Sequence, residues 1–303
     1  MKQSTTSNVD VKGALTNKGA FHGFLQSFPF PLLPLLVFLT IFFLWPISAL
    51  TGNAFRSNEG QFTFSNLMLL LQDPYRLAFK NSITLGLISA LVGAVPGLLI
   101  ALAIEKQGNQ TLKKFIASIS GVLANTGGVP LAFMFLAAFG PAGLVISTLK
   151  SIGIDLYGMG FTLFSFTGLI IVYSYFQIPI MVIVITPALT ALRKEWRDSA
   201  ANLGASKFQY WQKVGIPILM PSFIACYLLL FASAFSAFAT ARALTVGNIA
   251  LVPLQIGSLV DGNVTINQAN LGYALALGMI VISLLAMIPY LWIQSRTSKW
   301  QNR

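Results

Sequence analysis

Residues Asn81–Ile104 read NSITLGLISALVGAVPGLLIALAI and contain no acidic or basic side chain. An α-helix rises 1.5 Å per residue, so about 20 apolar residues cross the hydrocarbon core of a bilayer. The segment is therefore long and apolar enough to form a transmembrane helix. Its continuous apolar character argues against a membrane barrel, whose strands are segments of about 10 residues with alternating hydrophobicity.

Similar uncharged runs recur along the chain of 303 residues, which is 55% hydrophobic and only 9% charged. A soluble domain carries roughly 25% charged residues to keep its surface wetted. Most of this surface is therefore not expected to face water. The runs predict an all-α fold, a polytopic membrane bundle with about six crossings near residues 28–50, 81–104, 115–139, 161–189, 218–241 and 271–292. The third crossing is expected to end near Gly140-Pro141, because proline cannot continue a helix.

The positions of lysine and arginine predict the orientation. An even number of crossings places both termini on one side, and that side then carries fourteen of the 19 basic residues. Basic loops stay in the cytoplasm, so we expect cytoplasmic tails at 1–27 and 296–303 around a transmembrane domain at 28–295. The tail at 1–27 does not resemble a cleaved signal peptide, because the apolar run after it is about 23 residues long and lacks a cleavage site. Topology and contact with anionic lipid explain the net charge of +11 without nucleic acid.

Residue counts argue against several kinds of enzyme. Cys226 is the only cysteine and His22 the only histidine, which rules out a zinc cluster and a histidine-based nucleophilic triad inside the membrane. The sequence has no GxxxxGK[ST] phosphate loop. We therefore expect no catalytic and no metal-binding residues, and any nucleotide energy has to come from another subunit.

The eight acidic residues lie outside the predicted crossings or at their margins. Carriers driven by protons or sodium commonly hold a carboxylate at mid-membrane, where insertion costs roughly 2.5–3.5 kcal/mol. This distribution weakens the hypothesis of a sodium- or proton-coupled carrier. The hypothesis stays open, because backbone carbonyls can also bind sodium.

The cytoplasmic loop at 193–217 reads RKEWRDSAANLGASKFQYWQKVGIP, and its residues predict local structure. Good helix formers run from Glu195 to Leu203, and Gly204 suits the left-handed position that ends a helix. Ser206 followed by Gln209 is a capping-box start for a second helix. Pro217 then begins the next crossing. The sequence therefore predicts two short helices at an angle, which together form a compact knob below the membrane.

This loop resembles the EAA loop of binding-protein-dependent ABC importer permeases of the type I fold. The family pattern is Glu-Ala-Ala, three residues, Gly, nine residues and Ile-x-Leu-Pro. The chain has Asp198-Ser199-Ala200, Gly204 and Val214-Gly215-Ile216-Pro217 at that spacing. Looser similarity extends from about Ala78 to the C terminus and is strongest to permeases for spermidine and putrescine.

The resemblance implies a transport subunit of the bacterial cytoplasmic (inner) membrane. It implies a second permease subunit, of the same or a homologous chain, an external solute-binding protein, and ATPase subunits that bind ATP and Mg²⁺. The substrate would be a small polar solute such as a polyamine or phosphonate. The residues expected to couple the chain to the ATPase are Asp198, Ser199, Ala200, Gly204, Ala205, Ser206, Val214, Ile216 and Pro217. Asp198 could alternatively serve only to cap backbone amides.

Polar side chains inside the apolar runs are candidates for lining the translocation pathway, although hydrogen bonding between helices would also explain them. These candidates are Asn125, Tyr173, Tyr175, Gln177, Ser233 and Ser236. Gly93 and Gly97 form a small-xxx-small pattern around Pro96, which indicates close helix packing or a kink.

Overall fold

The computed structural model describes residues 32–57, 59–245, 247–260 and 269–301. The chain forms two compact units, Met1–Ala49 and Leu50–Arg303. Within the described residues the only β-type pairing is an isolated bridge between Arg56 and Phe62, and the ordered elements are otherwise helices. The predicted all-α fold is confirmed.

Six helical segments of the described chain are long and apolar enough to cross a membrane. They are Leu33–Ala54, Tyr75–Gln107, Val129–Ser151, Phe166–Thr190, Lys207–Ser236 and Asn270–Trp292. The first consists of α2 (Leu33–Leu39), the π-helical turn η2 (Thr40–Leu44) and α3 (Trp45–Ala54). The predicted tail at 1–27 and the start of the predicted crossing at 28–50 lie outside the described residues.

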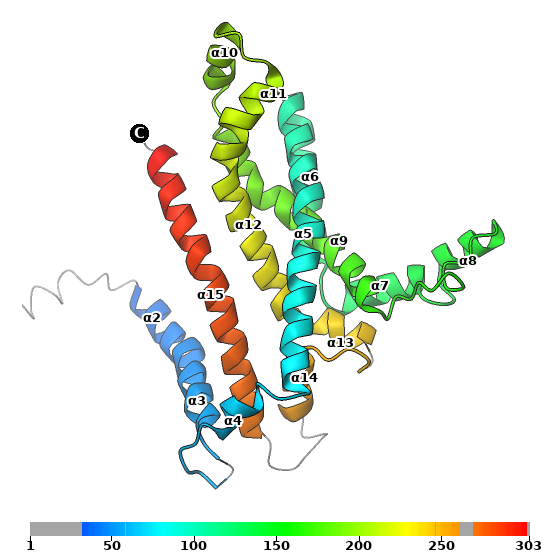
Figure 1. Ribbon diagram of the computed structural model, residues 1–303, viewed down its shortest axis with the longest axis vertical. Coiled ribbons are helices and arrows are strands. Elements are labelled where there is room, and N and C mark those ends of the chain that lie inside the picture. Colours follow the sequence, from blue (N-terminus) through cyan, green and yellow to red (C-terminus); the bar gives the residue numbers. More distant parts are fainter. Residues whose placement is uncertain (1–31, 58, 246, 261–268, 302–303) are drawn as a thin grey trace, which may run out of the picture. The chain divides into compact units, whose positions relative to one another are not determined.

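In the second unit, four long helices form the bundle. They are α5 (Tyr75–Gln107), α9 (Phe166–Thr190), α12 (Ile216–Ser236) and α15 (Ala269–Gln301). α5 packs against α9 and α12, and α12 also packs against α9 and α15 (Figure 1). The predicted crossings at 81–104 and 271–292 lie within α5 and α15.

The tightest helix contact lies between α5 and α9. A Cβ atom on Gly97 would stand 2.6 Å from Met181 Cβ and 2.8 Å from the Ile178 carbonyl oxygen, and one on Gly93 would stand 2.5 Å from Gln177 Cβ. Only glycine allows two backbones this close. The prediction of close packing at these two glycines is confirmed.

The predicted crossing at 115–139 differs from the structure, which has two helices there. α6 (Gln110–Asn125) stops before Gly127-Gly128, and α7 (Val129–Phe139) begins after them. Gly128 has φ 79°, outside the helical region, and Pro130 in the first turn of α7 has no N–H to extend a helix from α6. α7 ends directly before Gly140, as expected.

Two other predicted crossings have different ends. α9 starts at Phe166 rather than at 161, because Ser165 Oγ accepts a hydrogen bond from the Gly168 N–H at 3.1 Å and caps the helix. α12 stops at Ser236, where Ala237 takes an extended conformation, and the chain continues as α13 (Ala239–Thr245).

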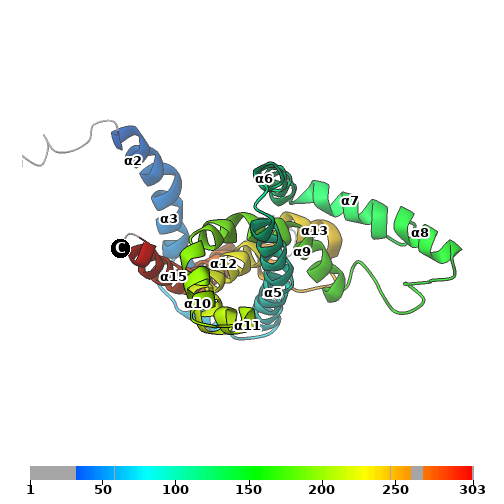
Figure 2. The ribbon, with the colours of Figure 1, turned by 90° about the horizontal axis from the view of Figure 1, so that it is seen from above.

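Shorter helices complete the second unit. They are α4 (Ser65–Leu69), α8 (Leu144–Ser151), α10 (Lys194–Asn202), α11 (Lys207–Tyr210) and α14 (Val252–Val260). In both ribbon views α7 and α8 extend away from the long helices (Figures 1 and 2). α14 packs against α15 and α5, and α4 packs against α15.

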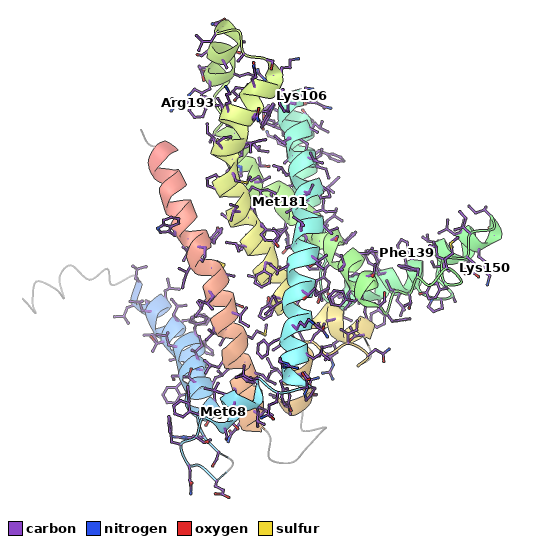
Figure 3. All side chains as sticks on the ribbon, in the orientation of Figure 1. Met68, Lys106, Phe139, Lys150, Met181 and Arg193 are labelled. Atoms are coloured by element: carbon purple, nitrogen blue, oxygen red, sulfur yellow. The ribbon has the colours of Figure 1, made fainter. Side chains whose placement is uncertain are left out.

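The bundle of the second unit has two distinct ends. α10, α11 and the C-terminal end of α15 lie at one end, and α4 and α14 lie at the other (Figure 1). Figure 3 places Lys106 and Arg193 at the first end and Met68 at the second. The basic residues assigned to the cytoplasm at 106, 193, 207 and 213 thus belong to the end that carries α10 and α11.

Candidate functional site

The knob at 193–217 starts with α10, which ends in a compact backbone cap. Gly204 has φ +78°. Its N–H donates to the Ala201 carbonyl at 2.9 Å, and the Ala205 N–H donates to the Ala200 carbonyl at 2.9 Å. This pair of bonds around a left-handed glycine is the Schellman motif. The prediction that Gly204 ends the helix in a left-handed conformation is confirmed.

A capping box starts the next helix two residues later. The Gln209 N–H donates to Ser206 Oγ at 3.2 Å, and the Ser206 N–H donates to Gln209 Oε1 at 2.8 Å. These two reciprocal bonds, together with the Schellman motif, leave the turn between α10 and α11 with few unsatisfied backbone groups. The turn at Leu203–Phe208 therefore forms a rigid corner.

The second helix of the knob differs from the prediction of a separate short helix. α11 runs without interruption through the π-helical turn η3 (Trp211–Gly215) into α12. The Ile216 N–H donates to the Trp211 carbonyl, and Pro217 lies in the first turn of α12. A wider π turn accommodates the missing donor of a proline without stopping the helix. The corner is thus continuous with a helix that is long and apolar enough to cross a membrane.

Asp198 does not have the capping role that the sequence left open. α10 begins at Lys194, four residues earlier, with no side-chain cap on its N-terminus. The Asp198 carboxylate is exposed, and the ion-pair partner of its Oδ1 is Arg197 Nε at 4.0 Å. The side chain is therefore accessible to another molecule.

Two large apolar side chains flank the corner, and the sequence interpretation did not select them as site residues. Leu203 is 88% exposed and Phe208 is 75% exposed. Their signal in the sequence is an apolar residue on each side of a glycine turn in a loop that is otherwise largely polar. Large apolar groups exposed to water at a fixed corner are typical of a protein-binding surface.

We expect Phe208 to lie outside the hydrocarbon core, although it belongs to the apolar segment Lys207–Ser236. That segment has 30 residues. It therefore extends about 45 Å as a helix, against a core of about 30 Å. Lys207 and Lys213 lie on either side of Phe208 in the sequence, so we expect the first two turns of the segment to protrude.

The candidate pathway residues fall into two groups. Tyr173 and Gln177 are fully buried. The Tyr173 hydroxyl donates to the Ala237 carbonyl at 3.0 Å, and Gln177 Nε2 donates to Ser89 Oγ at 3.2 Å. These two side chains join α9 to neighbouring segments, which is the hydrogen-bonding role that the sequence left open.

The other candidates lie nearer the surface. Tyr175 and Ser233 are half-buried, and the Tyr175 ring packs edge-on against Phe135 at 5.6 Å between ring centroids. Asn125 and Ser236 are exposed. Each of these two is the last residue of a helix that stops at one of the interruptions described above.

Residues 93–299 match the family model described as "Binding-protein-dependent transport system inner membrane component". The chain belongs to this family. It is a permease subunit of an ABC importer, and its place is the inner membrane, which it crosses several times. Family membership decides the class in favour of an importer permease over an ion-coupled carrier.

The permease aligns with curated relatives over most of its length. It is 24% identical to a probable sulfate transport system permease protein of Nephroselmis olivacea, over 88% of this chain and 89% of that protein. It is 25% identical to the spermidine/putrescine transport system permease protein PotC of Escherichia coli, over 80% of this chain and 86% of that protein. A putative 2-aminoethylphosphonate transport system permease protein of Salmonella typhimurium is 26% identical, over 64% and 68%.

Solved structures show the same fold. The permease aligns with a chain of a bacterial ABC transporter involved in the import of the acidic polysaccharide alginate, with a TM-score of 0.67 and 20% identity, over 92% of this chain and 96% of that chain. A second structure of an alginate transporter, in complex with its pentasaccharide-bound periplasmic protein, aligns with a TM-score of 0.64, 19% identity and coverage of 93% and 95%. The predicted type I importer permease fold is confirmed.

Proposed function

We propose that the permease forms half of a translocation pathway and couples to a separate ATPase through the corner at Leu203–Phe208. The observation that carries this proposal is the rigid, doubly capped corner with Leu203 and Phe208 exposed on its two sides. The corner lies at the end of the bundle that the basic residues assign to the cytoplasm. ATP and Mg²⁺ would be bound by the partner ATPase.

The continuity of α11, η3 and α12 supports a mechanical role for the corner. α12 packs against α5, α9 and α15, so it contacts each of the other long helices of the second unit. When nucleotide draws two ATPase subunits together, each would carry the corner docked on it. The corner would then move α12 and the helices packed on it, and the two permease subunits would rock around the solute path.

The substrate that we propose is a small polar solute such as a polyamine or a phosphonate, delivered by an external binding protein. The names of the relatives above support a small ionic solute but differ in its charge. The pathway candidates that reach the surface, Asn125 and Ser236, are neutral. Uptake of radiolabelled putrescine, 2-aminoethylphosphonate and sulfate by cells that overproduce the complete transporter would separate these classes. Uptake of none of the three would contradict the substrate proposal.

A double variant tests the docking surface. Replacing Leu203 and Phe208 by serine removes two exposed apolar groups without touching the corner's backbone bonds. If each of them contributes about 2 kcal/mol to ATPase binding, the double variant should lower the affinity by roughly three orders of magnitude. The measurement is co-purification of the ATPase with the tagged permease, together with ATP hydrolysis stimulated by the binding protein.

The matched control is Phe62→Ser. Phe62 is 71% exposed, but it lies in the loop before α4, at the opposite end of the bundle. The control should retain the ATPase. Equal recovery of the ATPase with the double variant and the control would contradict the proposed coupling surface.

A further inference from the structure

The two helix interruptions of the second unit lie against each other. The first is Thr126–Gly128, between α6 and α7, and the second is Ala237–Phe238, between α12 and α13. α13 packs against α7. A Cβ atom on Gly128 would stand 3.7 Å from Ala239 Cβ, so the first interruption lies within van der Waals reach of the first residue of α13, which directly follows the second interruption.

One hydroxyl group joins the first interruption to α13, which begins directly after the second interruption. Thr240 Oγ1 accepts a hydrogen bond from the Gly128 N–H at 3.1 Å and donates one to the Gly128 carbonyl at 3.2 Å. Thr240 is buried, with 2% of its surface exposed. Residues 112 positions apart in the sequence are therefore held together at a single backbone unit.

A second hydroxyl group reaches the same place from α9. The Tyr173 hydroxyl donates to the Ala237 carbonyl at 3.0 Å, and Ala237 is the residue at which α12 stops. Tyr173 has no exposed surface. Gln177, one turn further along α9, bonds to Ser89 of α5, so the same face of α9 is fixed to the bundle core.

Breaking these hydrogen bonds costs free energy because the interruptions lie within apolar segments. A backbone N–H or carbonyl without a partner in an apolar environment costs several kcal/mol. Separating the first interruption from α13 would leave the Gly128 N–H without the partner that the structure gives it, although the Gly128 carbonyl would keep its bond from the Ala132 N–H at 3.2 Å. Moving α9 away from the second interruption would take the Tyr173 hydroxyl from the Ala237 carbonyl. The interruptions are therefore expected to move as one body.

We propose that Thr240 and Tyr173 are positioning residues that lock the two interruptions into one joint throughout the transport cycle. The inference rests on the proposed function, in which this bundle forms half of the pathway. Asn125 and Ser236 are exposed and end α6 and α12 directly before the two interruptions. The joint therefore sets the spacing between the two polar side chains that are best placed to meet a solute.

Conservative substitutions distinguish an effect of the joint on transport from an effect on the stability of the protein. Thr240→Val keeps the shape of the side chain and removes both bonds to Gly128, and Thr240→Ser restores a hydroxyl. The matched control is Thr245→Val in the same helix. Thr245 is also buried, but its hydroxyl bonds within α13, to the Ala241 carbonyl at 2.9 Å. Tyr173→Phe removes the second bond without changing the ring.

The first readout is the amount of solute transported per ATP hydrolysed in the reconstituted complex. Leaving a buried backbone group unpaired costs about 1–3 kcal/mol, so Thr240→Val and Tyr173→Phe should each lower this ratio by about tenfold. Thr240→Ser and Thr245→Val should stay close to the wild type. A Thr240→Val complex with the wild-type ratio would overturn the proposal, and so would one in which Thr245→Val loses as much.

The second readout is a distance. Spin labels at Val122→Cys and Phe238→Cys, in a Cys226→Ser background, report the separation of the two interruptions by double electron–electron resonance. The distribution should be the same without nucleotide and with trapped ATP, and Thr240→Val should broaden it. A wild-type distance that changes between the two states would overturn the joint. A wild-type complex that hydrolyses ATP without moving solute would instead contradict the proposed function, and the distance would still test the joint.

Discussion

Gly204 shows how local chemistry produces the loop pattern of this family. Ala200 and Ala205 are the two ends of the longer Schellman bond, and Gly204 supplies the left-handed residue between them. Two positions of the pattern, Ala200 and Gly204, thus take part in a helix cap, and Ser206 with Gln209 adds a second cap. The sequence could predict this geometry because each bond joins residues no more than five positions apart.

Gly204→Val tests the corner at the level of one residue. A β-branched residue with φ > 0 costs about 1–2 kcal/mol. A Cβ atom at Gly204 would have no heavy atom within 4 Å of it, so the chain itself offers no steric obstacle. We expect normal insertion and abundance, but loss of ATPase co-purification or of transport-coupled hydrolysis. Membrane fractionation and stimulated ATP hydrolysis are the measurements.

The control for this change is Gly108→Val. Gly108 also has a positive φ, +67°, and open space around it, but it lies in the turn between α5 and α6. It therefore experiences a similar backbone cost outside the corner. If the two variants lose coupling to the same extent, backbone strain explains the loss and the corner has no special role.

The sequence does not predict which apolar side chains of the loop are exposed. Leu203 and Phe208 are apolar, and a sequence pattern does not say whether a given apolar side chain packs inside or stays exposed. The possible capping role of Asp198 was wrong because α10 starts one turn earlier than that role requires. Both facts depend on where the helix starts and on what lies beside it.

At the level of helices, the closest contact in the bundle is the crossing of α5 and α9. The spacing of Gly93 and Gly97 predicted close packing, but only the structure identifies the partner as α9, through Gln177 and Met181. Figure 3 shows Met181 between the two ends of the bundle. A pattern of small residues predicts which face of a helix packs closely but does not predict which helix packs against it.

Gly97→Ala should destabilise this crossing. The added methyl would stand 2.6 Å from Met181 Cβ and 2.8 Å from a backbone carbonyl, so the helices have to separate. Overpacking of this kind costs about 1–3 kcal/mol. The measurement is the thermal unfolding midpoint of the purified permease in detergent, which should fall.

Gly121→Ala is the matched control. Gly121 lies in α6, and an added methyl there would have nothing within 4 Å. Alanine favours a helix over glycine by about 1 kcal/mol, so this variant should be as stable as the wild type or more stable. Equal stability of Gly97→Ala and Gly121→Ala would show that the crossing tolerates a wider separation than the structure gives.

The two interruptions were not predicted as helix ends, and for different reasons. Gly127-Gly128 followed by Pro130 is a visible break signal, but it lies in a run whose apolar character dominates the pattern. Ala237 has no such signal, because neither glycine nor proline lies near it in the sequence. Its conformation is stabilised by the Tyr173 hydroxyl, a contact between residues 64 positions apart.

At the level of the whole molecule, the orientation that the basic residues predict has a direct test. Ala201 and Gln61 are both exposed and lie in α10 and in the loop before α4, at opposite ends of the second unit. Single cysteines at these positions, in a Cys226→Ser background, should react differently with a membrane-impermeant thiol reagent in spheroplasts. We expect labelling at Gln61→Cys and none at Ala201→Cys, and the reverse result would invert the topology.

Contact between the corner at Leu203–Phe208 and the ATPase can be measured by photocrosslinking from Phe208. A benzophenone amino acid replaces Phe208, or Phe62 as the control, in cells that produce the complete transporter. The two positions have similar exposure and lie at opposite ends of the bundle. We expect a crosslink from position 208 to the ATPase, identified by mass spectrometry, and none from position 62. Crosslinks to the ATPase from position 62, or none from position 208 in a complex that transports solute, would contradict it.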